Sequence, residues 1–266
     1  MSRTKAGAKR LIASASTLVR WLSPPCCLLC KKIHDRPQAI CRDCEIQLPR
    51  NSRACRQCGI PLGTTTPDMS HRHALWEHCI GCHRQPPLFQ QTLAPFLMHA
   101  NMRELIHLWK FQGQSRLTPL LGALFVSAVG SEHLKALPES TVLVPVPTYW
   151  HRQVMRGYDH TWMLAQAVRS QLPEKLRIKP WLHNTRYLRP QHRLNRRTRI
   201  NWGSNRFVAS RDMAGQHIIL IDDVMTTGAT AGSAATACDA AGALSTAVWC
   251  LARTPLPEAK PTDTLR

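Results

Sequence analysis

The chain has 266 residues, of which 44% are hydrophobic, so it is long enough to bury one large core or two modest ones. Its 35 lysines and arginines outnumber 16 aspartates and glutamates. The resulting formal charge of +19 favours polyanionic partners, either nucleic acid or phosphorylated small molecules. No apolar run approaches the length of a transmembrane helix, so we expect a cytoplasmic protein without membrane insertion.

The first 25 residues carry five basic residues and no acid. Leu11, Leu18 and Leu22 fall on one helical face, so residues 1–25 predict a basic amphipathic helix. The alternative is a signal peptide, which the charge of Arg20 within the apolar stretch disfavours.

Nine of the 11 cysteines lie within residues 26–82, and eight of these form four C-x-x-C pairs. Such pairs are typical of metal ligation in a reducing compartment and not of a disulfide scaffold. Two pairs complete a tetrahedral zinc site, and four thiolates leave no open position, so residues 26–84 predict a double zinc ribbon with two structural zincs. Sequential pairing places Cys27, Cys30, Cys41 and Cys44 on one ion and Cys55, Cys58, Cys79 and Cys82 on the other. Cross-braced pairing, first with third and second with fourth, is the alternative.

Residues 88–254 follow a proline-rich boundary and predict an α/β domain, with a parallel sheet flanked by helices. The expected strands are 91–97, 141–145, 206–209, 218–221 and 244–252, and the expected helices are 102–109, 117–129, 161–171 and 231–241. Lys110 lies in a turn-like segment and is expected to be solvated, with contact to an anion as the alternative. Three prolines mark residues 255–266 as a disordered tail.

The strand at 141–145 ends in the stiff turn Pro145-Val146-Pro147, at the sheet edge where Asp222 is expected. The loop beyond it carries Arg152 and Arg156, whose planar guanidinium groups suit a pyrophosphate. A solvated basic loop is the alternative.

The segment from Arg186 to Arg199 is the most basic in the chain and has no acid. Its arginines are Arg186, Arg189, Arg193, Arg196, Arg197 and Arg199. Arginines with nearby aromatic residues suit the phosphates and bases of single-stranded DNA. The same segment would also serve as a lid over a sugar pyrophosphate, and a solvated loop is the third alternative.

Four branched apolar residues, Ile218 to Ile221, predict a buried strand, and two acids follow at its end. Ligands of open α/β sheets bind beyond the carboxyl ends of the strands. Paired carboxylates accept hydrogen bonds from ribose hydroxyls, directly or through a divalent cation, and a loop at a helix N-terminus suits a phosphate. We therefore predict a sugar-phosphate site with Asp222 and Asp223 as its catalytic residues. The full site comprises Asp222, Asp223, Val224, Met225, Thr226, Thr227, Gly228, Ala229 and Thr230.

Six motifs follow one another along the chain in an order that resembles a known protein family. They are the four cysteine pairs, Lys-Phe-x-Gly at 110–113, Val-Pro-Val-Pro at 144–147, Arg-Gly-Tyr-Asp at 156–159, an arginine-rich segment at 191–201 and Asp-Asp-Val-Met-Thr-Thr-Gly at 222–228. The last motif resembles the phosphoribosyl pyrophosphate (PRPP) signature of type I phosphoribosyltransferases. The whole order resembles the ComF family of competence-related, phosphoribosyltransferase-like proteins, of which GntX is the enterobacterial type. Asp159 departs from the family pattern and adds a negative charge near the expected pyrophosphate contact.

The resemblance implies a double zinc ribbon, a type I phosphoribosyltransferase domain that binds PRPP with Mg²⁺, and other DNA-uptake proteins as partners. Two functions are expected. The first is a role in uptake or utilisation of external DNA, with single-stranded DNA as a partner and PRPP or a related sugar phosphate as a ligand. The alternative is a true phosphoribosyltransferase of nucleotide salvage, in which a nitrogenous base displaces pyrophosphate from PRPP. No residue stands out as a general base, so the sequence leaves turnover open.

Overall fold

The computed structural model describes residues 25–62, 78–130, 134, 136–148, 158–172, 176–185 and 206–255. The chain divides into two compact units, residues 1–48 and residues 49–266. The described part of the first unit contains the short helix α2 (Arg42–Ile46) and an isolated antiparallel bridge between Cys26 and Ile33. The predicted helix at 1–25 and tail at 255–266 lie outside the described residues, apart from Pro25 and Pro255.

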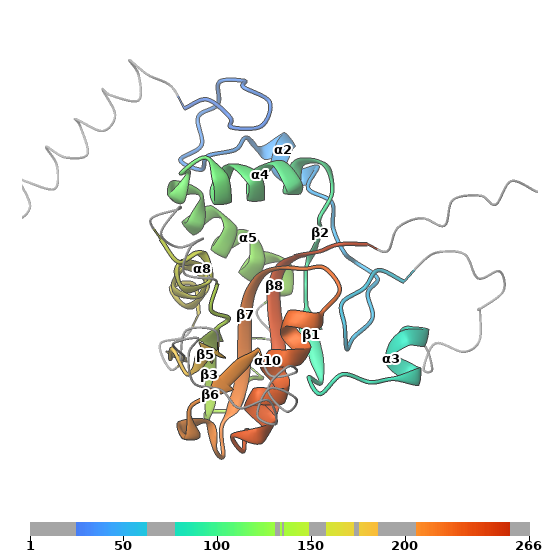
Figure 1. Ribbon diagram of the computed structural model, residues 1–266. Helices are drawn as coiled ribbons and strands as arrows, with labels where there is room; N and C mark the ends of the chain where they lie inside the picture. The colour runs from blue at the N-terminus through green and yellow to red at the C-terminus, as the bar shows by residue number, and fades with distance from the viewer. Residues whose placement is uncertain are drawn as a thin grey trace, which may run out of the picture. The chain divides into compact units, whose positions relative to one another are not determined.

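The second unit is built on a parallel sheet (Figure 1). Its strands are β1 (Gln91–Leu93), β2 (Phe96–Leu97), β3 (Thr141–Pro145), β4 (Arg177–Ile178), β7 (His217–Met225) and β8 (Ser245–Arg253). Their order is β1-β8-β7-β3-β4, β2 also pairs with β8, and each of these pairings is parallel. A separate antiparallel pair is formed by β5 (Leu182–Asn184) and β6 (Phe207–Ala209).

Helices flank the sheet, which confirms the predicted α/β class, and α8 (His160–Arg169) and α10 (Ala229–Ala240) pack directly on its strands. The other described helices of this unit are α3 (Ile80–Arg84), α4 (Ala100–Phe111) and α5 (Thr118–Val129), with the single turns η1 (Ser115–Leu117) and η3 (Arg211–Met213). The strand expected at 91–97 is divided into β1 and β2, because Ala94 and Pro95 leave the ladder between them. The short strands β4 and β5 were not predicted.

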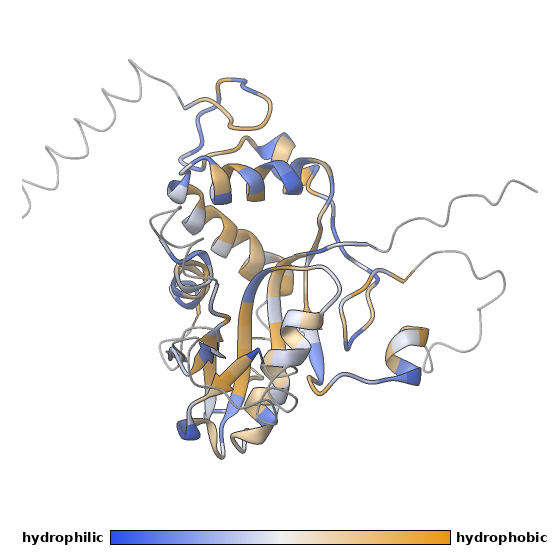
Figure 2. Cartoon of the chain, viewed as in Figure 1, coloured by the Kyte–Doolittle hydropathy of each residue, from blue (hydrophilic) through white to orange (hydrophobic). Residues whose placement is uncertain are grey.

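Strand β7 is buried on both faces, as its run of branched residues predicts. Ile218 and Leu220 belong to the same core cluster as the alanines of α10. Ile219 and Ile221, which alternate with them, are also almost fully buried. Figure 2 shows the resulting hydrophobic colouring along the central strands.

The sheet changes direction between β3 and β7. Strand β3 leads through α8 to β4 on one side, whereas β7 leads through α10 to β8 on the other. Right-handed crossovers in opposite directions place the two helices on opposite faces of the sheet. Figure 1 shows α8 and α10 on the two sides of β7. The carboxyl ends of β3 and β7 therefore form a topological switch point, where open α/β sheets bind their ligands.

The end of α4 is fixed beside this edge by two hydrogen bonds of Trp109, one of them buried. The indole Nε1 of Trp109 donates to Thr118 Oγ1 at 2.9 Å, and the Tyr158 hydroxyl donates to the Trp109 carbonyl at 2.7 Å. Trp109 is fully buried, and His160 packs edge-on against its ring. These contacts set the position of Lys110, the next residue along the helix.

Candidate functional site

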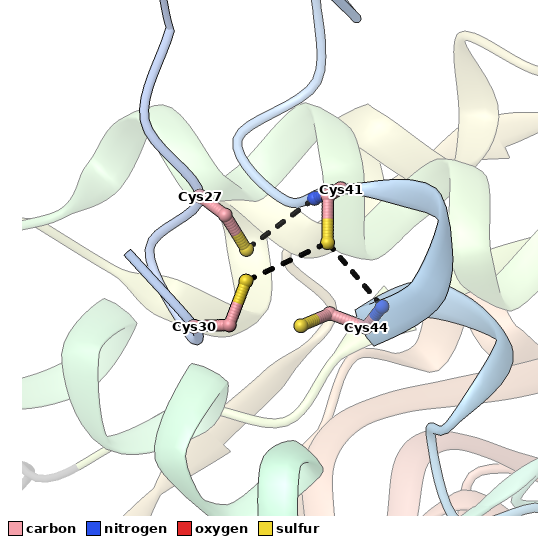
Figure 3. A group of neighbouring side chains, drawn as sticks. All are labelled: Cys27, Cys30, Cys41 and Cys44. Carbon is pink, nitrogen blue, oxygen red and sulfur yellow. Dashed lines mark hydrogen bonds between the residues drawn. The ribbon is translucent and has the colours of Figure 1, made fainter. Parts of the chain in front are cut away.

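The first cysteine cluster has the geometry of a tetrahedral zinc site. Figure 3 shows the side chains of Cys27, Cys30, Cys41 and Cys44 pointing to a common centre. Their sulfur atoms lie within 4.8 Å of one another, and the sulfurs of Cys30 and Cys41 are 3.7 Å apart. Zn–S bonds of about 2.3 Å in a tetrahedron require neighbouring sulfurs about 3.8 Å apart, so the residues fit this metal.

The second cluster repeats the first. It comprises Cys55, Cys58, Cys79 and Cys82, with 3.6 Å between the sulfurs of Cys58 and Cys79. In each cluster the backbone N–H of the third cysteine donates to the first sulfur, and the third sulfur caps a short helix. The pairing is therefore sequential, and the cross-braced alternative is wrong. Both sites are of the closed, structural kind.

The thiols of the first cluster are not equivalent without a cation. Burial alone would raise the pKa of the Cys27 thiol. Hydrogen bonds from backbone N–H groups, led by that of Cys41, together have the larger effect and lower this pKa to about 6. Burial raises the pKa of Cys44 far above its ordinary value, and the neighbouring thiols add to this effect. Four thiolates together therefore require a divalent cation at their centre.

The second cluster is hydrogen-bonded to the parallel sheet of its own unit. Thr92 in β1 donates from its backbone N–H to the Arg56 carbonyl at 3.0 Å and from its hydroxyl to the Gln57 carbonyl at 2.6 Å. The Gln57 side chain donates to the Pro87 carbonyl at 3.1 Å. The C-x-x-C turn at 55–58 is thus a fixed part of the sheet domain.

The paired acids lie at the switch point. Strand β7 continues through Asp222 and Asp223 to Met225 because β8 pairs with it that far, whereas pairing with β3 stops at Ile221. Both acids therefore lie within β7 and not after it. On the edge of β7 that faces β3, they lie beyond the last paired residue, Ile221. Their carboxylates accept hydrogen bonds from the next backbone N–H groups, at 2.9 Å for Asp222 and 2.6 Å for Asp223.

Lys110 forms an ion pair with Asp223. Its Nζ lies 2.5 Å from Asp223 Oδ2, and the two side chains are only 15% and 12% exposed. The expectation of a solvated lysine is wrong. Lys110 is in the last turn of α4, and the packing of Trp109 directs that turn to the acids.

Asp222 carries the most perturbed carboxyl group of this site. Burial, followed by the negative charge of Asp223, raises the pKa of Asp222 from 3.8 to about 7. The positive charges of Lys110 and Arg206 act in the opposite direction and do not cancel the rise. Near neutral pH this carboxyl group is poised between its protonated and ionised forms.

A cavity of about 320 Å³ opens over the acids. Its polar lining consists of Arg103, His107, Lys110, Thr148, Arg206, Asp222, Asp223 and Thr230. The guanidinium of Arg206 donates to the Thr230 hydroxyl at 2.8 Å, at the start of α10. A larger cavity of about 560 Å³ lies along β1, but its lining contains Arg56 as its one charged side chain and no acid. The paired acids and the basic side chains therefore make the smaller cavity the candidate ligand-binding site.

The loop after β7 presents a helix N-terminus to the same region. Gly228 is the N-cap of α10, has a φ of 85° and provides no side-chain cap. A left-handed conformation at this position favours glycine over residues with a Cβ. Thr226, Thr227 and Ala229 are exposed, and Met225 is buried in the core. The Ala229 N–H donates to the Thr227 hydroxyl at 3.3 Å, and the dipole and remaining N–H groups of this helix N-terminus suit an anion.

The arginines predicted to contact pyrophosphate or DNA lie outside the described part of the chain. They are Arg152, Arg156 and the six arginines from Arg186 to Arg199. Asp159 is described, and its carboxylate caps α8 by accepting from the backbone N–H groups of Thr161 and Trp162 at 3.1 and 3.2 Å. Its negative charge therefore stabilises the N-terminus of α8.

Two arginines of this region were not singled out by the sequence. Arg206 is the first residue of the strand predicted at 206–209, directly precedes β6 in the structure, and faces the acids only because β6 packs against α10. Arg253 is 3% exposed at the end of β8 and donates to the carbonyl of Met225, the last residue of β7, and to that of Thr226, the first residue of the loop after it. The one sequence signal for Arg253 is an arginine directly after an apolar strand.

Comparisons with known proteins agree with the zinc clusters. Residues 18–83 match the family model of the double zinc ribbon domain. The chain is 28% identical to DNA utilization protein YhgH of Escherichia coli (strain K12), over 81% of this chain and 90% of the relative. It is 27% identical to competence protein F of Haemophilus influenzae, over 85% and 96% of the two chains. It is 26% identical to competence protein ComFC of Bacillus subtilis, over 73% and 75%.

A search of the described helices for a membrane span found none of sufficient length and hydrophobicity. The resemblance carried by the motif order is confirmed: the chain contains a double zinc ribbon domain and is a homologue of proteins named competence protein F and DNA utilization protein.

Proposed function

We propose that this protein acts in the uptake or utilisation of external DNA and binds PRPP, or a related sugar phosphate, with Mg²⁺ in the cavity over Asp222 and Asp223. The observation that carries the ligand proposal is the meeting of paired acids, Lys110 and a helix N-terminus at the switch point of a parallel sheet. The DNA role rests on the names of the relatives and on the charge of +19.

Each part of a sugar phosphate has a matching group. The ribose hydroxyls, or a magnesium ion and its waters, would be held by the two carboxylates. The 5′-phosphate would be held by backbone N–H groups of residues 225–230 and by the dipole of α10. The pyrophosphate would meet the basic residues Arg152 and Arg156 of the loop that follows β3.

Calorimetric titration with PRPP and Mg²⁺ tests the ligand proposal. The double variant Asp222→Asn/Asp223→Asn is expected to bind at least about tenfold more weakly, because each lost charged contact costs about 1.5 kcal/mol or more. Asp239→Asn is the matched control, since Asp239 is an exposed acid on α10. Equal affinity of the double variant and the wild type would remove the sugar-phosphate site.

Single-stranded DNA binding is a separate part of the proposal, supported by the arginines between Arg186 and Arg199. The logarithm of the association constant is expected to fall linearly with the logarithm of salt concentration, because phosphate contacts release counterions. Replacing Arg193, Arg196 and Arg197 with alanine should make this slope shallower by about two. A salt-independent affinity would exclude binding through the phosphates.

The alternative function, a phosphoribosyltransferase of nucleotide salvage, is favoured by the complete 222–230 motif. On this proposal the site stabilises a developing positive charge at the anomeric carbon while a nitrogen nucleophile displaces pyrophosphate. Release of pyrophosphate from PRPP in the presence of a panel of bases and amines tests turnover. Binding without release would assign the pocket a ligand or regulatory role.

A further inference from the structure

Arg253 lies between two sites that the sequence separates. Its guanidinium Nε donates to the Cys58 carbonyl at 2.9 Å, and Cys58 belongs to the second cysteine cluster. Its Nη1 donates to the Met225 carbonyl at 3.1 Å and also to the Thr226 carbonyl. One side chain therefore joins the second cluster to the last residue of β7 and the first residue of the loop that follows it.

These contacts determine where the loop N–H groups point. A trans peptide is planar, and its C=O and N–H bonds point in opposite directions. Because Arg253 holds the carbonyls of Met225 and Thr226, the N–H groups of Thr226 and Thr227 are turned away from the arginine. Without Arg253, the Met225 carbonyl would keep only the Thr254 N–H at 2.9 Å, and the Thr226 carbonyl would lose its charged anchor.

The charge of Arg253 makes the connection costly to break. The side chain is 3% exposed, and among the described residues no carboxylate forms an ion pair with it. A buried guanidinium must then be stabilised by carbonyl oxygens, and each lost acceptor leaves it less satisfied. Four thiolates around one Zn²⁺ carry net negative charge, so a loaded second cluster also favours the arginine electrostatically.

We propose that Arg253 is a positioning residue through which metal loading of the second cluster holds the 225–230 loop in its anion-binding geometry. The coupling concerns this chain's own backbone. Its consequence for ligand affinity rests on the proposed sugar-phosphate function.

Hydrogen–deuterium exchange of the full-length, zinc-loaded protein tests the coupling without any ligand. Cys82→Ser impairs the second cluster, and Arg253→Lys keeps the charge but loses the fork that reaches both the loop and Cys58. Each variant is expected to raise exchange of the loop-dependent Ala229 and Gly232 amides, which donate to the Thr227 hydroxyl and the Gly228 carbonyl, about tenfold. The double variant should add little more, because both changes break one connection.

Two internal references make this test decisive. Cys44→Ser impairs the first cluster, which supplies none of the carbonyls that Arg253 binds, and should leave the loop unchanged. Amides of the core strand at 218–220 report general unfolding. The proposal is overturned if Cys82→Ser leaves loop exchange unchanged, or if loop and core exchange rise equally.

Titration with PRPP and Mg²⁺ forms the second arm. Arg253→Lys should weaken binding about tenfold while zinc content stays at about two per chain. A wild-type protein that binds no PRPP, together with the expected exchange pattern, would reject the sugar-phosphate function and leave the coupling intact. Unchanged affinity in Arg253→Lys would reject the proposed role of the arginine in ligand binding.

Discussion

Replacing Asp222 with asparagine should stabilise the protein above neutral pH and have little effect in acid. The pKa of Asp222 is raised in the folded state from 3.8 to about 7, so the native state holds its proton more tightly than the unfolded chain. The carboxyl group therefore contributes stability that is complete below about pH 4 and is lost as pH rises to about 7. Asparagine mimics the protonated form at every pH and still accepts the hydrogen bond from the Asp223 N–H.

The size of the effect follows from the shift. About three pKa units correspond to at most about 4 kcal/mol of unfolding free energy, at 1.36 kcal/mol per unit. Asp222 is partly exposed and its titration is coupled to Asp223, so we expect about 2 kcal/mol at about pH 8. The advantage of the variant should shrink progressively between about pH 7 and about pH 4, near the two pKa values of the carboxyl group in the folded and unfolded states.

Urea denaturation at several pH values measures this advantage as a difference between variant and wild type. The zinc clusters also titrate, but they are the same in both proteins, so their contribution cancels in the difference. Asp239→Asn, an exposed acid on α10, should show a pH-independent difference close to zero. A constant difference between Asp222→Asn and wild type over this range would refute the raised pKa and the burial argument behind it.

Three other substitutions probe separate contacts. Lys110→Met should cost about 3 kcal/mol of unfolding free energy by leaving Asp223 as a buried, unpaired acid, and adding Asp223→Asn should recover most of that loss in the same denaturation assay. Asp159→Ala removes the cap of α8 and should cost about 1 kcal/mol without changing affinity for PRPP. A weaker ligand affinity in that variant would contradict its purely structural role. Cys82→Ser should lower the zinc content by metal analysis from about two to about one per chain, and a content still near two would contradict the second site.

The local elements of the sheet domain were predictable because their signals are local. The branched run at 218–221 specifies a buried strand, and the glycine at 228 marks the start of a helix. Strands β4 and β5 have only two and three residues and too little pattern to be recognised. The spacing of the cysteines gave the two zinc sites but did not distinguish sequential from cross-braced pairing, since both use the same C-x-x-C turns.

The contacts that complete the site were not predictable, because each depends on tertiary packing. Lys110 reaches Asp223 only once Trp109 has fixed the end of α4. Arg253 reaches Cys58 and Met225 only because β8 runs beside β7 and the second cluster lies at the same end. The sequence does not show which residue a charged side chain will contact, so a solvated side chain is the default interpretation. That interpretation is wrong for residues that form buried ion pairs.

The charges of the cavity explain why a cation and a sugar phosphate would bind together. Near neutral pH, Asp222 is partly protonated and Asp223 is neutralised by Lys110, so the two acids show little net charge to solvent. A divalent cation entering alone would have to displace both the proton and the lysine, which leaves an unpaired ammonium group in the cavity. A phosphorylated sugar entering alone would meet the two acids while Lys110 is still paired with Asp223, so the ammonium group would not be available to the phosphates. When both enter, the cation takes the acids and the released lysine faces the phosphates, so every charge is paired. On the proposed function, the ion pair between Lys110 and Asp223 therefore makes ligand and metal binding mutually dependent.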